Sequence, residues 1–569
     1  MLGRAGAMVR SEQSSTAFHN HASRGIRAIS DSRGITSLSG LPCTASAKPI
    51  PITLWTLGPL PRLGPQSVAP SPVATTSMNS RLIRMFHPNR IKDELRDGLT
   101  LCRVLVNYKT LPANSEATAM TDCNHQPLRF STLANRAVVA DFLGGRLTTD
   151  AGALLLREVA EKTRLFEALD AAIPDPRNPV FIIHDQRALL AQRITAIALG
   201  YEDLNDHQEL RTDPALVVAA GKVPEPGMSL ASSPTLCRLE NRVQRKTLFR
   251  IAEVLVDQFI ASHSLPPEHL MLDFDATDDP VHGHQEGRFF HGYYDHHCYL
   301  PLYVFCGHEL LVAYLRPSNI DAFKHSRAVL KLLVQKLRAA WPDVKITIRA
   351  DSGFCRWKLM RWCDRHGIGY ILGIAKNPAL ERLAADEIAT AARQFDRAGQ
   401  PQRLFGSFSY AAATWDRTRR VVVKAEHTAK GANPRFVVTN VPGDPRELYE
   451  DVYCQRGEME NRIKEQQLDL FAGRTSCHRF LANQFRLLLS STAYVLVQAL
   501  RRTAVAGTEL ATAQIGTLRL KLFKVAARVV LSARRVVFHL ASSYPYHELF
   551  RAVFERLTTA RMQVVVEPG

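Results

Sequence analysis

The sequence predicts an α/β protein whose core is a mixed β-sheet, preceded by an α-helical region. Residues 271–277 and 345–350 alternate apolar and polar side chains, which is typical of half-buried strands. Between them, short apolar runs at 299–305 and 310–315 predict a β-hairpin, and residues 320–340 have the apolar spacing of a helix. The order of these elements predicts three meandering strands, a helix and a fourth strand.

Further elements follow the fourth strand. A helix is predicted near 356–366 and a strand at 370–374. Three more strands, at 405–412, 419–426 and 434–440, are separated by turns. These three lie before an acidic helix, and we expect them to form a β-rich insertion in the sheet core.

The region before the sheet core is predicted to be helical. Apolar residues recur at helical spacing in 148–170 and 185–199 behind residues that can cap a helix, and residues 234–263 add arginines to this pattern. The amphipathic stretch at 483–502 and the basic stretch at 518–535 are candidates to close the core or to mediate dimer contacts, and residues 503–569 are expected to be mostly helical. We therefore expect an N-terminal segment at 1–119, a helical region at 120–265, a sheet core at 266–376 and 444–502, a β-rich insertion at 377–443 and a C-terminal region at 503–569.

The composition favours a polyanion as partner. Lys and Arg number 72 against 54 Asp and Glu, which gives a formal net charge of +18 and a pI of about 9.6. Such a charge attracts polyanions and makes binding sensitive to salt. The ten cysteines include no Cys-x-x-Cys pair, so neither a zinc knuckle nor a disulfide framework is indicated, and a reducing cytoplasm fits.

The segment before residue 120 differs in composition from the rest. No acidic residue occurs between Asp31 and Asp93, Pro and Ser are abundant, and no helical or strand period persists. We expect translation to begin at Met120, which would make the upstream segment an over-extended reading frame. A disordered basic arm that binds DNA is the alternative interpretation.

Acidic side chains lie on the polar faces of two predicted strands. Asp273 and Asp275 point to the same side of the strand at 271–277, and Asp351 ends the strand at 345–350 on its polar face. Asp275 lies nearer the strand end, which favours it as a ligand, and Asp273 is the second candidate.

A predicted helix at 453–465 carries a third acid. A carboxylate flanked by a cation and a phenol suits a phosphate-cutting site, because the acid can hold metal while its neighbours hold phosphate oxygens. With the two aspartates it would form an all-oxygen set suited to Mg²⁺ or Mn²⁺. A solvated charged helix in ion pairs is the competing interpretation. Four side chains at spacing i, i+3, i+7 and i+11 share one face of this helix: Tyr453, Arg456, Glu460 and Lys464.

The late helix resembles a signature of bacterial insertion-sequence transposases, which is Tyr, two residues, Arg, three residues, Glu, six residues and Lys. Tyr453, Arg456 and Glu460 match the first three positions. Gln467 occupies the position of the lysine, and Lys464, one turn earlier, is the candidate to replace it.

Three separated segments make the resemblance more specific. Residues 275–283, 349–355 and 456–461 are similar, in this order, to DDE-type transposases of insertion-sequence group 1380, and the similarity spans about 120–557. The resemblance implies an RNase H-like mixed-sheet core with the β-rich insertion before the last acidic helix. It also implies that the helical region helps to recognise DNA ends.

The same resemblance implies an activity, its ligands and its partners. The activity is two-metal phosphodiester hydrolysis at the ends of the element, followed by strand transfer. The ligands are two Mg²⁺ ions, which Mn²⁺ can replace, and double-stranded DNA both as terminal inverted repeats and as target. A homodimer on DNA in the bacterial cytoplasm, without membrane contact, is also implied. The expected catalytic and metal-binding residues are Asp275, Asp351 and Glu460, and the expected DNA- and phosphate-binding residues are Tyr453, Arg456 and Lys464.

Two other functions fit parts of the sequence. Asp273 and Asp275, two residues before Thr277, also resemble the opening motif of haloacid-dehalogenase-like phosphatases, whose first aspartate attacks phosphorus. Such a phosphatase would continue with a Rossmann-like repeat, whereas a hairpin is predicted here. The other alternative is a catalytically inactive DNA-binding protein of the same fold.

Overall fold

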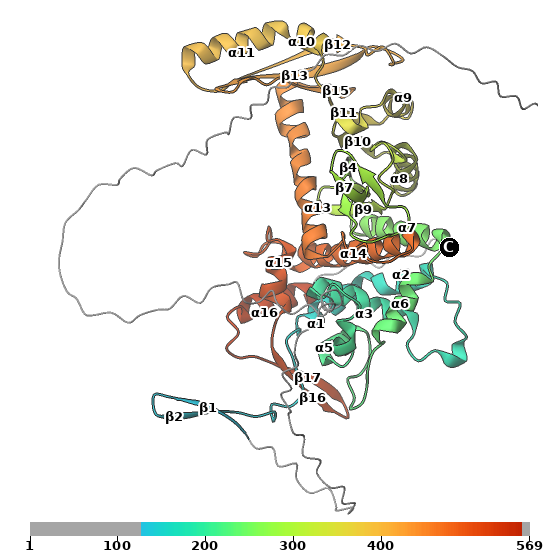
Figure 1. The fold of residues 1–569 in the computed structure, drawn as a ribbon, viewed down its shortest axis with the longest axis vertical. Coiled ribbons are helices and arrows are strands. Elements are labelled where there is room, and N and C mark those ends of the chain that lie inside the picture. The colour runs from blue at the N-terminus through green and yellow to red at the C-terminus, as the bar shows by residue number, and fades with distance from the viewer. Residues whose placement is uncertain (1–126, 560–569) are drawn as a thin grey trace, which may run out of the picture. The chain divides into compact units, whose positions relative to one another are not determined.

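A computed structural model describes residues 127–559 of the protein. The expectations for the segment before Met120 therefore lie outside the described residues. Within the described part, nine strands form one large mixed sheet that has helices on both faces (Figure 1).

Five strands form the part of this sheet that carries the predicted acids. They are β4 (His269–Ala276), β8 (Leu302–Cys306), β9 (Glu309–Tyr314), β10 (Lys345–Ala350) and β11 (Gly369–Ile374). Their spatial order is β9-β8-β4-β10-β11, in which β4, β10 and β11 are parallel and β8 is antiparallel to its neighbours. The predicted strands and hairpin are confirmed.

The remaining strands of the sheet come from the segment predicted to be a β-rich insertion. They are β12 (Gln402–Tyr410), β13 (Arg419–Thr428), β14 (Gly431–Ala432) and β15 (Arg435–Thr439). Because β15 pairs with β11, these strands extend the central sheet in the order β12-β13-β15-β11 and form no separate layer.

The first part of this segment is helical, so the prediction of a β-rich insertion from residue 377 is wrong there. The side chain of Asn377 caps α10 (Pro378–Leu383), and α11 (Ala385–Ala398) follows. Gly399, with a φ of 66°, ends α11 in the left-handed conformation that favours glycine. The Ala-rich sequence of α11 favours a helix over a strand.

Helices cover one face of the sheet and share its apolar core. Leu330 and Met360 pack in the same cluster as Leu272 of β4 and Ile348 of β10. The helix that was predicted from residue 320 begins only at Ser326. The loop before it folds around the buried guanidinium of Arg316. The helices on this face are α7 (Arg245–Ala261), α8 (Ser326–Ala340), α9 (Trp357–Arg365) and α11.

The region before β4 is mainly helical, but it begins with strands that were not predicted. Besides α7, its elements are β1 (Leu128–Leu133), β2 (Arg136–Ala140), β3 (Leu147–Thr148), α1 (Ala153–Thr163), α2 (Leu165–Ala172), α3 (Gln186–Leu199), α4 (His207–Leu210), α5 (Pro214–Ala219) and α6 (Ser233–Asn241). The β1–β2 hairpin turns at Ala134 and Asn135, which both have positive φ, as tight hairpin turns require.

The opposite face of the sheet packs against two long helices. Met459 and Ile463 of α13 (Gly457–Asp469) are buried, and α14 (Phe480–Leu500) is buried along most of its length. α14 lies between β9 and the helices α1 and α3 (Figure 1). One hydrophobic core therefore joins the helical region to the sheet, and the predicted boundary after residue 265 does not separate two cores.

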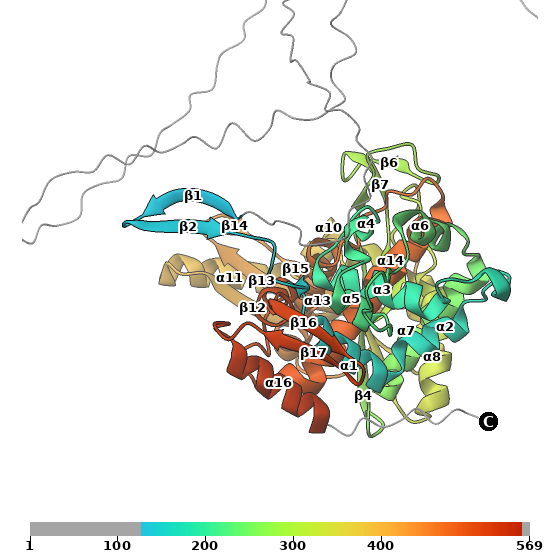
Figure 2. The same cartoon turned by 90° about the horizontal axis from the view of Figure 1, so that it is seen from below.

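The C-terminal region, which was expected to be mostly helical, contains a hairpin that begins within the basic stretch at 518–535. Its elements are α15 (Ile515–Leu518), β16 (Ala527–Ser532), β17 (Arg535–Leu540) and α16 (His547–Thr559). β16 and β17 lie next to α16 (Figure 2), and β16 also pairs with β3. Ala527 and Val529 are buried while Arg528 and Val530 are exposed, which is the alternation of a strand.

Smaller elements complete the described chain. They are β5 (Asp279–Pro280), β6 (Phe289–His291) and β7 (His296–Tyr299), which pair in the order β5-β7-β6, and α12 (Pro445–Glu447). None of the helices between residues 127 and 559 has the length and apolar character needed to cross a bilayer.

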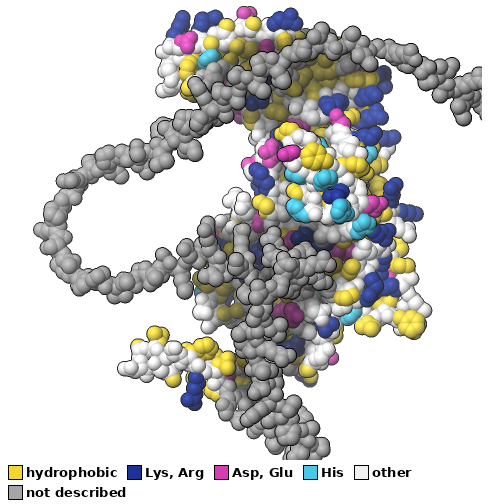
Figure 3. Space-filling model, viewed as in Figure 1, with side chains coloured by type: hydrophobic (Ala, Val, Ile, Leu, Met, Phe, Trp, Pro, Cys, Tyr) yellow, Lys and Arg dark blue, Asp and Glu magenta, His cyan; other side chains and the backbone are white. Residues whose placement is uncertain are grey.

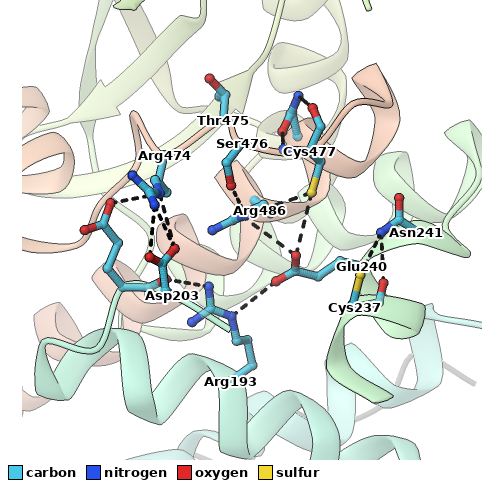
Figure 4. A network of polar contacts seen from close by, with 12 residues as sticks. Arg193, Asp203, Cys237, Glu240, Asn241, Arg474, Thr475, Ser476, Cys477 and Arg486 are labelled. Carbon is cyan, nitrogen blue, oxygen red and sulfur yellow. Dashed lines mark hydrogen bonds and ion pairs between the residues drawn. The ribbon is translucent and has the colours of Figure 1, made fainter. Parts of the chain in front are cut away.

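A buried polar network joins the helical region to the segment around α14 (Figure 4). Glu240 of α6 is fully buried, and its carboxylate is 3.2 Å from Nε of Arg193 in α3 and 3.9 Å from Nε of Arg486 in α14. Before α14, Arg474 pairs with Asp203 at 2.9 Å. A buried charge that loses its partner is costly, so these contacts couple the two regions.

Candidate active site at the carboxyl edge of the central sheet

Two of the predicted acids lie at the same edge of the central sheet. Asp275 is the penultimate residue of β4, and Asp351 directly follows β10. These strands are parallel neighbours with Ala350 opposite Phe274, so their carboxyl ends coincide and Asp351 follows beside Asp275. The structure therefore brings these two aspartates together.

Asp273 is held differently from Asp275. Its carboxylate oxygens accept hydrogen bonds from Nε and Nη2 of Arg349 at 2.5 and 2.7 Å, and neither side chain is more than 7% exposed. Arg349 also donates to the backbone carbonyl of Val452, in the helical segment that leads to Glu460. We call this pair and its contact to Val452 the helix clamp, because it fixes that segment to the sheet. Asp273 is thereby engaged by a cation of the protein itself.

The third acid reaches the sheet edge on a helical segment of changing geometry. A π-helical turn at Leu448–Tyr453 and a 3₁₀ turn at Cys454–Arg456 lead into α13. Irregular helical turns of this kind are frequent at functional sites. Arg456 stands between two acids, with Nη2 2.7 Å from Oε1 of Glu460 and Nη1 3.8 Å from Oδ2 of Asp275. One guanidinium thus joins the helix glutamate to the strand aspartate.

The site carries more negative charge than Arg456 can neutralise. Burial raises the pKa of Asp275 to about 7, and the charges of Asp351 and Glu460 add to the rise while Arg456 opposes it. Burial also raises the pKa of Tyr453, where Arg456 opposes the rise and Asp351 adds to it. Carboxylates gathered in a partly desolvated site favour the binding of a further cation.

Comparison with known proteins supplies the family. The family model described as transposase DDE domain group 1 matches residues 130–562. The chain belongs to this transposase family. No curated protein matches it. A solved cryo-EM structure of a piggyBac transposase synaptic complex with hairpin DNA is 11% identical, with 66% of this chain and 81% of that chain covered and a TM-score of 0.33. That score is too low to assign a common fold.

The lysine position of the signature is occupied by a structural residue in this transposase. Gln467 donates through Nε2 to the carbonyl of Asp278 and to Oδ1 of Asp279, both at 3.1 Å. Asp279 is fully buried, and burial raises its pKa to about 7. Gln467 therefore links α13 to β5, whereas Lys464 is exposed on α13. Lys464 remains the candidate for the basic role.

The expected divalent metal can be tested against these side chains. Their donor chemistry fits, because Mg²⁺ and Mn²⁺ prefer carboxylate oxygens. Between residues 127 and 559, however, no three His, Cys, Asp or Glu side chains lie close enough together to hold one ion. Asp275 and Asp351 are neighbours, whereas the carboxylate of Glu460 is paired with Arg456. Glu460 could join the aspartates as a ligand only after leaving Arg456.

Three residues that shape the site were not among the predicted site residues: Arg349, Gly373 and Asp279. Strand alternation places Arg349 on the same polar face of β10 as Asp351, so this residue had a signal in the sequence. Gly373 had none, because its importance comes from the close approach of Tyr453 across the fold. Asp279 had no such signal either, because its burial depends on the distant α13.

We expect Gly373→Ala to displace the ring of Tyr453. A Cβ atom at this position would lie 2.5 Å from Oη of Tyr453 and 3.1 Å from the backbone nitrogen of Ser352. Overpacking of this kind costs roughly 1–3 kcal/mol, which should lower the melting temperature. The double variant Gly373→Ala/Tyr453→Phe lacks the clashing hydroxyl and should recover most of the loss. An unchanged melting temperature in the single variant would contradict this close approach.

Proposed function

We propose that this protein is a DNA transposase of the insertion-sequence type, which cuts the ends of its element and joins them to target DNA. One observation carries the proposal. One arginine lies between a helix glutamate and a strand-end aspartate, and a second strand-end aspartate lies beside the first, in a chain that belongs to a transposase family. The segments that resemble bacterial group 1380 contain these four residues.

We infer that the core is RNase H-like. The strand order β9-β8-β4-β10-β11, with β8 as the antiparallel member next to β4, supports this inference. So does the sequence order of the acids, since Asp275 and Asp351 end two neighbouring strands and Glu460 follows on a later helix.

Asp275, Asp351 and Glu460 would hold two Mg²⁺ ions, which Mn²⁺ could replace. Such ions, when bound, activate the attacking oxygen and stabilise the leaving oxygen of a phosphodiester. The helix clamp of Asp273 and Arg349 would keep the glutamate helix at the strand ends. Both side chains of the clamp are buried.

Tyr453, Arg456 and Lys464 would contact the DNA. The guanidinium of Arg456 can present two parallel N–H groups to a phosphate, the geometry that makes arginine–phosphate contacts strong. Lys464 follows Glu460 by one turn on α13, and its exposed ammonium group would extend this contact along the backbone.

The partners follow from the same proposal. Double-stranded DNA would bind both as terminal inverted repeats and as target, in line with the net charge of +18. The helical region before β4 is the candidate for recognising the ends. Two protomers would act together on a pair of ends in the bacterial cytoplasm.

Excision and integration of a marked element with its native flanking DNA test the proposal. We expect Mg²⁺-dependent joining by the wild-type chain, lost on chelation. Asp351→Asn should lower joining by roughly three orders of magnitude, because bound metal supplies several kcal/mol to such reactions, and should still bind the ends. Asp343→Asn, at an exposed aspartate just before β10, is the matched control. Full joining by Asp351→Asn would refute the assigned site.

The same experiment separates the alternatives. An inactive DNA-binding protein would bind the ends tightly without cutting them in the wild type. A phosphatase would hydrolyse small phosphoesters in a manner dependent on Asp273. The hydrogen bonds from Arg349 to both oxygens of Asp273, and the antiparallel strands β8 and β9 after β4, weigh against the phosphatase.

A further inference from the structure

The outer sides of α8 and α9 carry a concentration of positive charge. α8 contains no acidic residue. The single acid of α9, Asp364, is 12% exposed and pairs with Arg419 of β13 and with Arg417 in the turn before it. Dark-blue Lys and Arg side chains line the border of the molecule where these two helices lie (Figure 3). We define the helical basic face as Arg327, Lys331 and Arg338 of α8 with Lys358, Arg361 and Arg365 of α9.

The cations of this face form no ion pairs with carboxylates of the described residues. Within the described residues, no carboxylate lies within 4 Å of Arg327, Lys331, Lys358 or Arg365, which are all exposed. Two cations rest over the ring of Trp357, with the Nζ atom of Lys358 at 5.6 Å from its centroid and Cζ of Arg361 at 5.9 Å. Neighbouring cations differ, since Lys336 pairs with Asp257 and Arg356 with Asp321.

The two helices lie side by side. Both pack on the same face of the sheet, through the apolar cluster that contains Leu272 and Ile348. At their far ends, Arg338 of α8 donates to the carbonyls of His366 and Gly367, just after α9. The cations of the face also lie along one side of each helix. They are four and seven residues apart on α8 and three and four residues apart on α9, and these spacings return to the same side of a helix.

The helical basic face begins at the sheet edge that carries the acids. β9 and β10 are both parallel to β4, so the chain leaves each of them at the edge where Asp275 and Asp351 lie. α8 follows β9 and α9 follows β10, and therefore both helices start at this edge. Arg356 and Asp321, paired at 2.7 Å, tie the two starting points together. The positive ends of both helix dipoles point the same way.

We propose that the helical basic face binds the phosphate backbone of a DNA duplex that continues past the acidic edge of the sheet. This inference rests on the proposed function and adds a second contact surface to it. Lysines and arginines without base-reading geometry bind phosphates whatever the sequence. The surface therefore suits flanking or target DNA, whose sequence varies, and it does not by itself select the inverted repeat.

Binding measured without catalysis tests this surface. The full chain is titrated with a duplex of unrelated sequence in the presence of a chelator, at several salt concentrations. For Arg327→Gln/Lys358→Gln we expect roughly tenfold weaker binding and a salt dependence shallower by about two counterions, because each lost phosphate contact reduces the slope by about one. The matched control is Arg393→Gln/Arg397→Gln on α11, where three acids accompany the two exposed arginines.

The outcomes separate this inference from its competitors. Equal affinities and slopes in the two double variants would overturn it. Unchanged DNA binding together with lost binding of a polyglutamate peptide would overturn it as well, by assigning the face to an acidic protein segment. If the double variant binds the duplex more weakly but the wild type shows no joining, the DNA-binding surface is supported and the proposed function fails. Binding to cleaved ends, to uncut ends with their flanks and to a target plasmid is then compared. A binding defect on the plasmid alone assigns the face to target DNA. A binding defect only on uncut ends with flanks assigns it to flanking DNA.

Discussion

Replacing Arg349 by methionine is expected to destabilise the protein by about 3–5 kcal/mol, the usual cost of removing one partner from a buried ion pair. Asp273 would lose its cation at a position where its side chain is only 4% exposed and where burial already raises its pKa, so it would either stay as an uncompensated charge or take up a proton. The carbonyl of Val452 would lose its donor at the same time. Because Val452 precedes the helix that carries Glu460, we expect the variant to lose joining activity together with stability.

Two measurements check this prediction. Thermal unfolding of the full chain reports the stability, and hydrogen exchange of the amides at 448–456 reports whether the glutamate helix has loosened. Arg338→Met is the matched control, because Arg338 donates to backbone carbonyls at the surface. The double variant Asp273→Leu/Arg349→Met should recover much of the stability, since an apolar pair needs no charge compensation. Equal losses in Arg349→Met and Arg338→Met would contradict the helix clamp.

Asp275→Asn is expected to abolish joining and yet raise thermal stability. Burial raises the pKa of Asp275 to about 7, whereas an unfolded aspartate has a pKa of about 3.9. As the pH rises, the unfolded chain therefore releases its proton first, and the native state loses stability between about pH 4 and pH 7. Each unit of that pKa difference corresponds to roughly 1.4 kcal/mol. Asparagine carries no charge and avoids the loss.

Asp279→Asn is the partner variant for this prediction. Burial also raises the pKa of Asp279 to about 7, but its carboxylate accepts from Gln467 and takes no part in the proposed chemistry. Both variants should melt above the wild type at pH 8 by a margin that shrinks at pH 5, and only Asp279→Asn should keep joining DNA. A gain independent of pH would contradict the stated cause. Loss of joining in Asp279→Asn would place this carboxyl in the chemistry.

The sequence contained enough information to predict the strands that carry the acids. Alternation identified β4 and β10, and it placed Asp275 and Asp351 on polar faces at strand ends. Partner choice is not encoded in this alternation, so nothing local indicated that β15 pairs with β11 and extends the sheet. The helix α11 lies in a segment that was expected to be β-rich because three strands follow it, although its own Ala-rich composition favours a helix.

The site itself could be predicted only in part, because its geometry depends on contacts between residues far apart in the sequence. A helical face predicted from spacing brings Arg456 near Glu460, but the approach of Arg456 to Asp275 depends on how α13 packs on the sheet. The burial of Asp279 depends in the same way on Gln467, which lies 188 residues later. Charge and spacing predict which groups can act, and packing decides which of them meet.

The buried network around Glu240 limits how such a protein can be divided or recombined. Arg193 and Arg486 approach the same carboxylate from opposite sides of the interface between the early helices and α14. A chimaera that takes its first 265 residues from a relative would need to bring a compatible α14 with them. The early helices are thus fixed against α14, and, under the role in end recognition proposed above, a change of DNA-end preference would come from surface substitutions while this shared interior stays intact.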